Sequence, residues 1–254
     1  MIERLLPAYV SCAATREVSV AYGNLFPEEE ELIATAVPKR RNDFATARAC
    51  ARRAMGRLGL EPVAVLHGKR GMPLWPEGVV GSLTHCEGYR AAALARAGDV
   101  LSLGIDAEPH APLPDGVAEL VVLPSERERF AAAGGEAGDI HWDRLLFSAK
   151  ESVFKTWYPL TLTELDFEEA DLTFHREAPE GREGREGREG REGERAGVGS
   201  SGRAVEGTFS ARLLRTDPAV PPVLEGRWRI EDGIVATALL LRADQREAGA
   251  PQSP

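Results

Sequence analysis

One segment near the middle of the chain, residues 100–108, constrains the fold more than any other. It carries large apolar side chains at alternate positions: Leu101, Leu103 and Ile105. It then ends in two acids, Asp106 and Glu108. Because side chains alternate between the two faces of a strand, the apolar residues should face a core while both carboxylates face the other way. We therefore expect a strand that brings two acids to the edge of a buried sheet.

Two carboxylates on one strand face, Asp106 and Glu108, repel each other unless a positive group lies between them. A hard cation such as Mg²⁺ or Mn²⁺ meets that need, because such ions prefer carboxylate oxygens. The same Asp-x-Glu pattern also occurs where an ordinary surface strand ends and water solvates both acids. The pair alone therefore leaves a metal site and a solvated strand end as alternatives.

A later segment, residues 142–157, has the period of a helix, and Pro159 is expected to end it. Its apolar stripe consists of Leu146, Ala149, Val153 and Trp157. Glu151 and Lys155 lie one turn apart and share another face, whereas Lys150 lies off that face. The Glu151–Lys155 pair is either part of a site for a metal and phosphate or a surface ion pair, which stabilises a helix by only about 0.3–0.5 kcal/mol.

An earlier segment, residues 37–60, also has a helical period. Its apolar positions are Phe44, Ala47, Ala51, Met55 and Leu58. Arg41, Arg48 and Arg52 fall within about 20° of one direction on this helix. Guanidinium groups in such a stripe can bind phosphate through forked hydrogen bonds, and a solvated helix face has the same pattern. Both interpretations stay open.

The remaining pattern predicts an α+β protein in two halves. Strands are expected at residues 63–66, 79–86, 91–94, 100–105, 165–174, 207–214, 225–230 and 234–241. Residues 176–203 hold a Gly-Arg-Glu repeat with Val198 as its only large apolar residue, so we expect a disordered loop there. We expect halves at residues 1–105 and 106–242, a frayed tail at 243–254, and a ligand cleft where the halves meet.

Charge and composition exclude several classes of protein. The formal net charge of −9 is unfavourable for a nucleic-acid binder. No segment approaches the roughly 20 apolar residues of a membrane span, and Glu3 and Pro7 do not fit a secretory signal. Three cysteines without a CxxC motif favour a reducing compartment, so we expect a cytoplasmic protein. The length permits a self-sufficient monomer, which is our expectation.

The chain resembles the Sfp-type 4′-phosphopantetheinyl transferases, most closely the actinobacterial members and those like enterobactin synthase component D. The resemblance covers about residues 39–241 and rests on four blocks in a fixed order: Lys39-Arg40-Arg41 with Phe44 and Arg48, Gly81-Ser82-Leu83-Thr84-His85-Cys86, Gly104-Ile105-Asp106-Ala107-Glu108, and Phe147-Ser148-Ala149-Lys150-Glu151 with Lys155. Each block is modest by itself, but the order and spacing of all four are highly specific.

The resemblance implies two pseudo-symmetric α+β halves with coenzyme A between them. The implied reaction moves the phosphopantetheine arm of coenzyme A onto a serine of an acyl or peptidyl carrier protein and releases 3′,5′-ADP, in polyketide, non-ribosomal peptide or siderophore synthesis. Asp106, Glu108 and Glu151 would hold Mg²⁺ or Mn²⁺. Glu151 would take the serine proton, directly or through a water molecule, and Lys155 would assist the leaving phosphate.

The resemblance also implies which residues contact coenzyme A: Arg41, Arg48, Lys69, Arg70, Ser82, Thr84, His85, Lys150 and Lys155. Within this set, His85 would lie near the 3′-phosphate. One departure is visible at Met72, which stands where many members carry a lysine near the adenine end. Lys69 and Arg70, just upstream, would take over that role.

Two rival functions fit the same residues. A Mg²⁺-dependent nucleotide phosphohydrolase would use the same acids with water as the nucleophile. A non-catalytic coenzyme A-binding module would need the basic residues but not three acids. The apolar run within residues 112–123 is interpreted equally as a surface for a carrier helix or as core.

Overall fold

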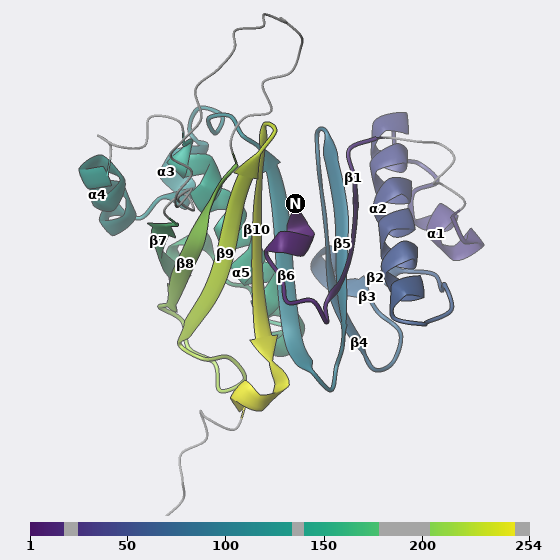
Figure 1. Ribbon diagram of the computed structural model, residues 1–254. Helices are drawn as coiled ribbons and strands as arrows, with labels where there is room; N and C mark the ends of the chain where they lie inside the picture. The colour runs from purple at the N-terminus through teal and green to yellow at the C-terminus, as the bar shows by residue number, and fades with distance from the viewer. Residues whose placement is uncertain (18–24, 134–139, 178–203, 247–254) are drawn as a thin grey trace, which may run out of the picture.

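The structure, a computed structural model, describes residues 1–17, 25–133, 140–177 and 204–246. Most of the Gly-Arg-Glu repeat and most of the tail, for which we expected disorder, lie outside these residues. The chain forms two antiparallel sheets that stand side by side, each with a long helix against it (Figure 1). The expected α+β fold with two pseudo-symmetric halves is confirmed.

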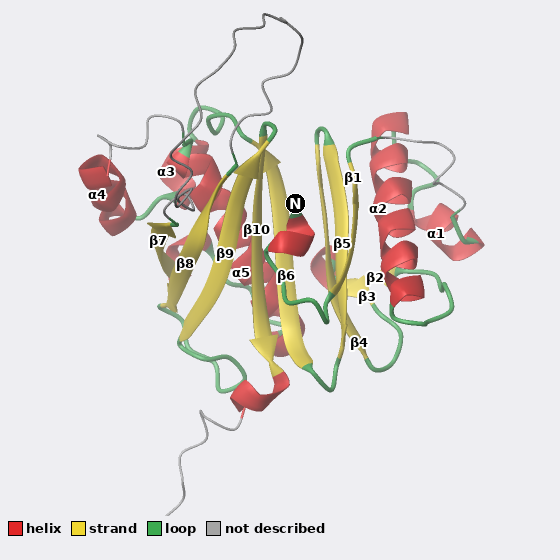
Figure 2. Cartoon of the chain, viewed as in Figure 1, coloured by secondary structure: helices red, strands yellow, loops and turns green. Residues whose placement is uncertain are grey.

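The smaller sheet has the strand order β1-β5-β4. Its strands are β1 (Ser11–Thr15), β4 (Val79–Cys86) and β5 (Tyr89–Arg96). Helix α2 (Pro38–Arg57) packs against this sheet, as the apolar stripe of the sequence predicts (Figure 2). Cys50, Ala51, Ala54 and Met55 from the helix meet Ala92 and Leu94 from β5 in one buried cluster.

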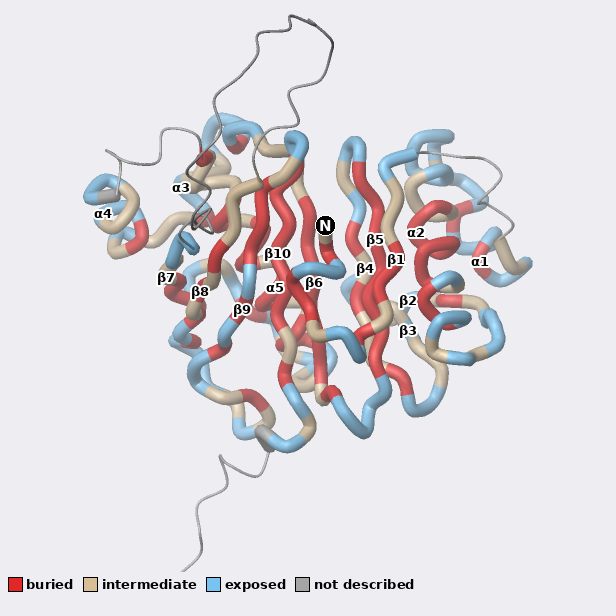
Figure 3. Tube along the Cα trace, in the orientation of Figure 1, coloured by how far each residue is buried: buried red, intermediate tan, exposed pale blue. Residues whose placement is uncertain are grey.

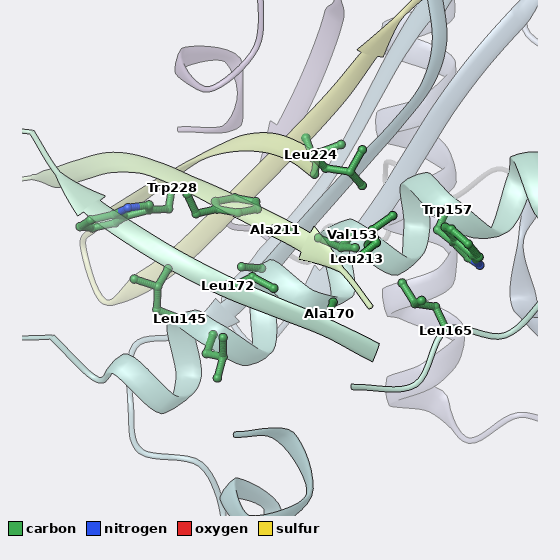
Figure 4. Packing of buried hydrophobic residues seen from close by; sticks show 14 of the residues in the cluster. Leu145, Val153, Trp157, Leu165, Ala170, Leu172, Ala211, Leu213, Leu224 and Trp228 are labelled. Atoms are coloured by element: carbon green, nitrogen blue, oxygen red, sulfur yellow. The ribbon is translucent and has the colours of Figure 1, made fainter. Parts of the chain in front are cut away.

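The larger sheet has the order β6-β10-β9-β8-β7. Its strands are β6 (Val100–Pro109), β7 (Ala170–Arg176), β8 (Val205–Leu213), β9 (Val223–Glu231) and β10 (Ile234–Arg242). Strands β8, β9 and β10 form the meander that the sequence predicts. Helix α5 (Trp142–Thr161) packs on this sheet through residues such as Val153 and Trp157 (Figure 4).

Shorter elements complete the chain. The helices are α1 (Pro27–Leu32), α3 (Val117–Val121) and α4 (Pro124–Ala133), and a two-stranded ribbon pairs β2 (Leu66–His67) with β3 (Pro73–Leu74). Single 3₁₀ turns lie at Ile2–Arg4, Lys69–Gly71, Phe167–Glu169 and Ala243–Arg246. Among the described residues, no helix combines the length and the apolar character that crossing a bilayer requires.

The space between the two sheets holds a third part of the core. Leu103, Ile105 and Ala107 from β6 meet Ile2 and Leu5 from the N-terminus there. In Figure 3 the buried segments run through β5, β6 and β10, at the centre of the molecule. The two halves therefore share buried apolar surface.

Three local expectations differ from the structure. Leu101 packs in the cluster around α5, away from Leu103 and Ile105, because the pairing of β6 with β10 shifts register at this point. Helix α5 continues through Pro159 and ends only at Leu162, whose backbone is left-handed (φ 53°). The strand expected at 63–66 is reduced to β2, which starts at Leu66.

Candidate active site

The facing edges of β4 and β6 are joined by side-chain hydroxyls instead of a backbone ladder. The amide of Ile105 donates to Ser82 Oγ at 3.1 Å, and the amide of Ala107 donates to Thr84 Oγ1 at 3.0 Å. We call these two hydrogen bonds the hydroxyl seam. The seam satisfies the edge amides of β6, which would otherwise lack partners in a buried setting. It also places the strand that carries Asp106 directly beside the strand that carries His85.

A cleft of about 300 Å³ lies beside the hydroxyl seam. Residues from both halves line it: Arg48, Arg70, Gly71, Met72, Pro73, Gly81, Ser82, Leu83, Thr84, His85, Asp106, Glu151, Phe154, Lys155, Tyr158 and Pro159. Eight of the residues that the sequence predicts for the site are in this group. The expectation of a ligand cleft between two halves is therefore confirmed.

Glycine at position 104 lets helix α5 approach β6 closely enough to share this cleft. A Cβ atom built on Gly104 would lie 2.0 Å from the carbonyl oxygen of Ser152 and 2.6 Å from Thr156 Oγ1. Only a residue without a side chain fits there, since real Cβ contacts are much longer. The close approach places the α5 face with Glu151 and Lys155 next to Asp106, two residues beyond Gly104.

Buried hydroxyls fix α5 against β10. Thr237, which pairs with Asp106 across the ladder, shares hydrogen bonds with Ser152 Oγ at 2.6 Å and with Ser148 Oγ at 3.0 Å. Thr237 Oγ1 also donates to the carbonyl of Ser148 at 2.9 Å. Ser148 and Ser152 lie on the same side of the helix as Glu151 and Lys155, so this contact sets the rotation of the helix.

Asp106 and Lys155 form an ion pair inside the cleft. Lys155 Nζ lies 2.7 Å from Asp106 Oδ1 and 3.3 Å from the carbonyl oxygen of Ile105. Burial by itself would lower the pKa of Lys155, but the carboxylates of Asp106 and Glu151 outweigh burial and raise it. The ammonium therefore stays charged at neutral pH and available to an anion.

Glu108 faces a different cation. Arg144 Nη1 lies 2.9 Å from Glu108 Oε2, and the same guanidinium donates to the carbonyls of Ala111 and Pro112. Burial and the nearby charge of Asp106 raise the pKa of Glu108 to about 6, although Arg144 opposes the shift. Arg144 thus ties one acid of the expected metal site to the loop that follows β6.

Glu151 lines the cleft from α5. Its pKa is raised by burial and by the carboxylate of Asp106, while Lys155 acts in the opposite direction. A raised pKa means that the site disfavours a further negative charge at this position. An added cation would reverse that preference.

The acids fit a hard divalent cation in their chemistry, although they are not grouped as a preformed cage. Among the described residues, no three His, Cys, Asp or Glu side chains are gathered into a metal-binding group. Asp106 Oδ2, however, is buried and has no hydrogen-bond partner among them. A buried carboxylate oxygen without a donor costs free energy, which a cation would recover. Mg²⁺ needs only one or two protein carboxylates when phosphate oxygens and water complete its shell.

Basic groups from the other half also line the cleft. Arg48 is buried, with its guanidinium 3.7 Å from the centre of the Phe44 ring and its Nε donating to the carbonyl of Val65. Burial lowers the pKa of Arg48 to about 10, so the group remains charged. Arg70 donates to Glu164 at 2.8 Å, and His85 lines the cleft from β4.

Four predicted residues do not line this cleft in the described part of the chain: Arg41, Lys69, Glu108 and Lys150. Arg41 donates to the carbonyls of Ile33 and Ala34 at the end of α1. Lys150 is buried, and its ammonium donates to Glu126, to the carbonyl of Val121 and to that of Phe167. Since these bonds use all three ammonium hydrogens, Lys150 acts as a structural group and we do not assign it to the ligand.

Sequence reasoning missed three residues that the structure brings to the site: Arg144, Phe154 and Tyr158. A signal for Arg144 was present, because Arg144, Ser148, Glu151 and Lys155 recur at helical spacing on one face. The ring of Phe154 lies 5.4 Å from that of Tyr158, and together they form an apolar wall of the cleft.

Fold and site together define a class of protein: a two-lobed α+β protein whose cleft is lined by both acids and guanidinium groups. Comparison with known proteins narrows this class. Residues 28–95 match the 4′-phosphopantetheinyl transferase N-terminal domain, and residues 102–195 match the 4′-phosphopantetheinyl transferase superfamily. The chain belongs to the 4′-phosphopantetheinyl transferase family, and the resemblance seen in its sequence is confirmed.

Three curated relatives support this assignment. The chain is 50% identical to the 4′-phosphopantetheinyl transferase Svp of Streptomyces mobaraensis, over 96% of this chain and 90% of Svp. It is 47% identical to Npt of Nocardia iowensis, over 94% of this chain and 99% of Npt. It is 45% identical to PptT of Mycobacterium tuberculosis, over 85% of each protein. Each of these names describes a 4′-phosphopantetheinyl transferase.

Proposed function

We propose that this protein transfers the 4′-phosphopantetheine group of coenzyme A to a serine of an apo acyl or peptidyl carrier protein and releases 3′,5′-ADP. The observation that carries the proposal is the cleft itself, which is lined by a buried guanidinium group and by a carboxylate whose Oδ2 has no partner among the described residues. Coenzyme A has matching charges, a 3′-phosphate at one end of its nucleotide and a pyrophosphate at the other. In the proposed arrangement the 3′-phosphate is contacted by Arg48, Arg70 and His85. The pyrophosphate is contacted by Lys155.

Asp106, Glu108 and Glu151 would hold Mg²⁺, or Mn²⁺ in its place. When bound, the ion neutralises charge on the pyrophosphate and stabilises the charge that develops during phosphoryl transfer. The raised pKa values of Glu108 and Glu151 support this role, since burial and the nearby charge of Asp106 cause them, and Oδ2 of Asp106 has no donor among the described residues. Ser82 and Thr84 would border the nucleotide from β4.

Glu151 and Lys155 are the proposed catalytic residues. The serine oxygen of the carrier forms a bond to the phosphorus that bears the pantetheine arm, and the bond from that phosphorus to the bridging oxygen breaks. Glu151 accepts the serine proton, directly or through a water molecule. Lys155 stabilises the negative charge on the departing 3′,5′-ADP. A carboxylate with a raised pKa is a stronger base than an ordinary one, which suits this role.

The carrier protein would approach the open side of the cleft. For the apolar run within residues 112–123, core and docking surface were equal expectations. The structure contains both environments: Val121 is 2% exposed and belongs to the core, whereas Leu120 is 75% exposed. We include Leu120 in the proposed docking face. One chain supplies both sides of the cleft, so we also propose that the protein acts as a monomer.

Intact-mass analysis tests the function. Apo carrier domains from fatty acid, polyketide and non-ribosomal peptide systems are incubated with the protein, coenzyme A and Mg²⁺. We expect at least one carrier to gain the mass of a single phosphopantetheine group, with release of 3′,5′-ADP. Coenzyme A cleaved without any carrier gaining mass would point to a phosphohydrolase. Coenzyme A bound but left intact would point to a binding module.

A further inference from the structure

The two oxygens of the Asp106 carboxylate have different surroundings. Oδ1 accepts hydrogen bonds from Thr84 Oγ1 at 3.2 Å and from Lys155 Nζ at 2.7 Å. Oδ2 is buried and has no partner within the described residues. A carboxylate held at one oxygen by two donors cannot rotate freely about its last bond, so the direction of Oδ2 is set by the donors to Oδ1.

Thr84 is a fixed donor. Its hydroxyl accepts the amide hydrogen of Ala107 at 3.0 Å, which leaves its own hydrogen free to point at Asp106. The side chain is 2% exposed, and a β-branched residue has few rotamers, so the hydroxyl is held from both sides. Through this one group the position of β4 determines the orientation of an acid on β6.

We propose that Thr84 is a positioning residue for the Asp106 carboxylate, holding Oδ1 so that Oδ2 is presented to the divalent cation. The proposal rests on the proposed function, in which Asp106 is a metal ligand. Ligating carboxylates are commonly oriented by a second hydrogen-bonding group, and loss of that group typically weakens metal binding about 10–100-fold. Thr84 supplies such a group from the opposite half of the molecule.

Thr46 on α2 is a matched control. It is also a buried threonine, 2% exposed, and its Oγ1 donates to the carbonyl of Asn42 at 2.7 Å. Thr46 does not line the cleft, and the bonds described for it do not include one to Asp106. Thr46→Val therefore makes the same change of hydroxyl to methyl as Thr84→Val, but it does not free the carboxylate.

The test measures binding of Mn²⁺ to the full chain in the presence of coenzyme A and without a carrier protein, by electron paramagnetic resonance of the free ion. We expect Thr84→Val to weaken Mn²⁺ binding about tenfold, and Thr46→Val to leave it close to that of the wild type. Thr84→Ser keeps the hydroxyl and should restore binding. Hydrogen exchange at the amide of Ala107 should rise in Thr84→Val, which verifies that this variant breaks its bond of the hydroxyl seam.

The outcomes separate this inference from the function on which it rests. Asp106→Ala must weaken Mn²⁺ binding if the metal site is where we place it; unchanged binding overturns the site and the inference together. Weaker binding in Asp106→Ala but wild-type binding in Thr84→Val overturns the inference alone. Equal weakening in Thr84→Val and Thr46→Val also overturns the inference alone. If Thr84→Val does not fold, Thr84→Ala replaces it in the same comparison.

Discussion

At the scale of single residues, the three acids of the proposed metal site have different surroundings. Asp106 is paired with an ammonium group, Glu108 with a guanidinium group, and Glu151 has a pKa raised by burial. Because each acid has a different partner, each is expected to respond differently to substitution. This difference allows metal binding and proton transfer to be tested by separate variants.

The proposed base gives the first prediction. Glu151→Gln removes the proton acceptor and one metal ligand while keeping the size of the side chain, so turnover should fall roughly 10²-fold or more. The measurement is the rate of carrier modification at saturating Mg²⁺ and coenzyme A. Glu128→Gln, an exposed glutamate on α4, is the control and should have the wild-type rate. Turnover of Glu151→Gln near that of the wild type would remove both roles from Glu151.

The ion pair between Arg70 and Glu164 gives the second prediction. Arg70 and Glu164 have side chains 61% and 48% exposed, and exposed pairs contribute only about 0–1 kcal/mol, so a phosphate can displace the carboxylate. Glu164→Gln should lower the Michaelis constant for coenzyme A by up to about fivefold, because Arg70 no longer has to leave a partner. Arg70→Gln should raise it. An increase in both variants would show that the pair, intact, helps to shape the binding site.

The residue types of the site could be predicted from the sequence because acids, arginines and glycines stand at fixed spacings around Asp106. The groups that each of these residues would contact could not be predicted. Lys150 and Lys155 were both expected to contact coenzyme A, yet Lys150 is enclosed by Glu126 and two carbonyls while Lys155 lines the cleft. Glu126 belongs to α4, which the sequence did not predict, and a buried ion pair depends on such long-range packing.

At the scale of elements, the contact between α5 and β6 decides whether the site can form. Gly104→Ala would push a methyl group against the carbonyl of Ser152, which is backbone and cannot move aside. We expect a loss of about 3 kcal/mol in the free energy of unfolding and weaker binding of coenzyme A, because α5 carries Glu151 and Lys155. Urea denaturation and calorimetry measure the two effects. Gly98→Ala, in open space on a turn, is the control and should change neither.

A salt-bridge cluster at the other side of the larger sheet gives a pH-dependent prediction. Arg129 on α4 and Arg212 on β8 both bind Asp171 on β7. Burial would raise the pKa of Asp171, but the hydrogen bonds from the two arginines outweigh burial and lower it. A lowered carboxylate pKa adds stability above the ordinary value of 3.8, and that stability is lost as the pH falls below it.

Asp171→Asn removes this contribution. At neutral pH the free energy of unfolding of the variant should be about 1–2 kcal/mol lower than that of the wild type, since charged hydrogen bonds are lost. The difference should shrink as the pH falls from about 5 to about 2, where Asp171 of the wild type becomes protonated. Urea denaturation at several pH values measures the trend. A difference that stayed constant over that range would mean that the charge of Asp171 does not contribute.

Elements with strong periodicity were predictable, and elements defined by context were not. Helices α2 and α5 and strands β8 to β10 follow from apolar spacing, because each presents one face to a core. Strand β1 and helix α4 have weak patterns and owe their conformation to neighbours in the fold. The continuation of α5 through Pro159 depends on packing near the end of the helix, which the local rule for proline does not include.

At the scale of the whole molecule, the two halves meet through side chains. The hydroxyl seam and the apolar core between the sheets hold β4 beside β6. The cleft takes its guanidinium groups from one half and its acids from the other. We expected the boundary between the two halves to lie between residues 105 and 106, and both residues belong to the continuous strand β6. This boundary stays a prediction. The sequence indicated two halves because its pattern repeats, but the register of their junction depends on two hydroxyls far away in the chain.

The most direct test of the account is the position of the metal ion. Crystals of the protein with coenzyme A and Mn²⁺, measured at the manganese absorption edge, should show one anomalous peak at bonding distance from Asp106 Oδ2 and from a carboxylate oxygen of Glu151. The pyrophosphate should reach the same ion. A peak bound elsewhere, or coenzyme A in the cleft with no ion near Asp106, would contradict the central claim that these acids converge on one cation.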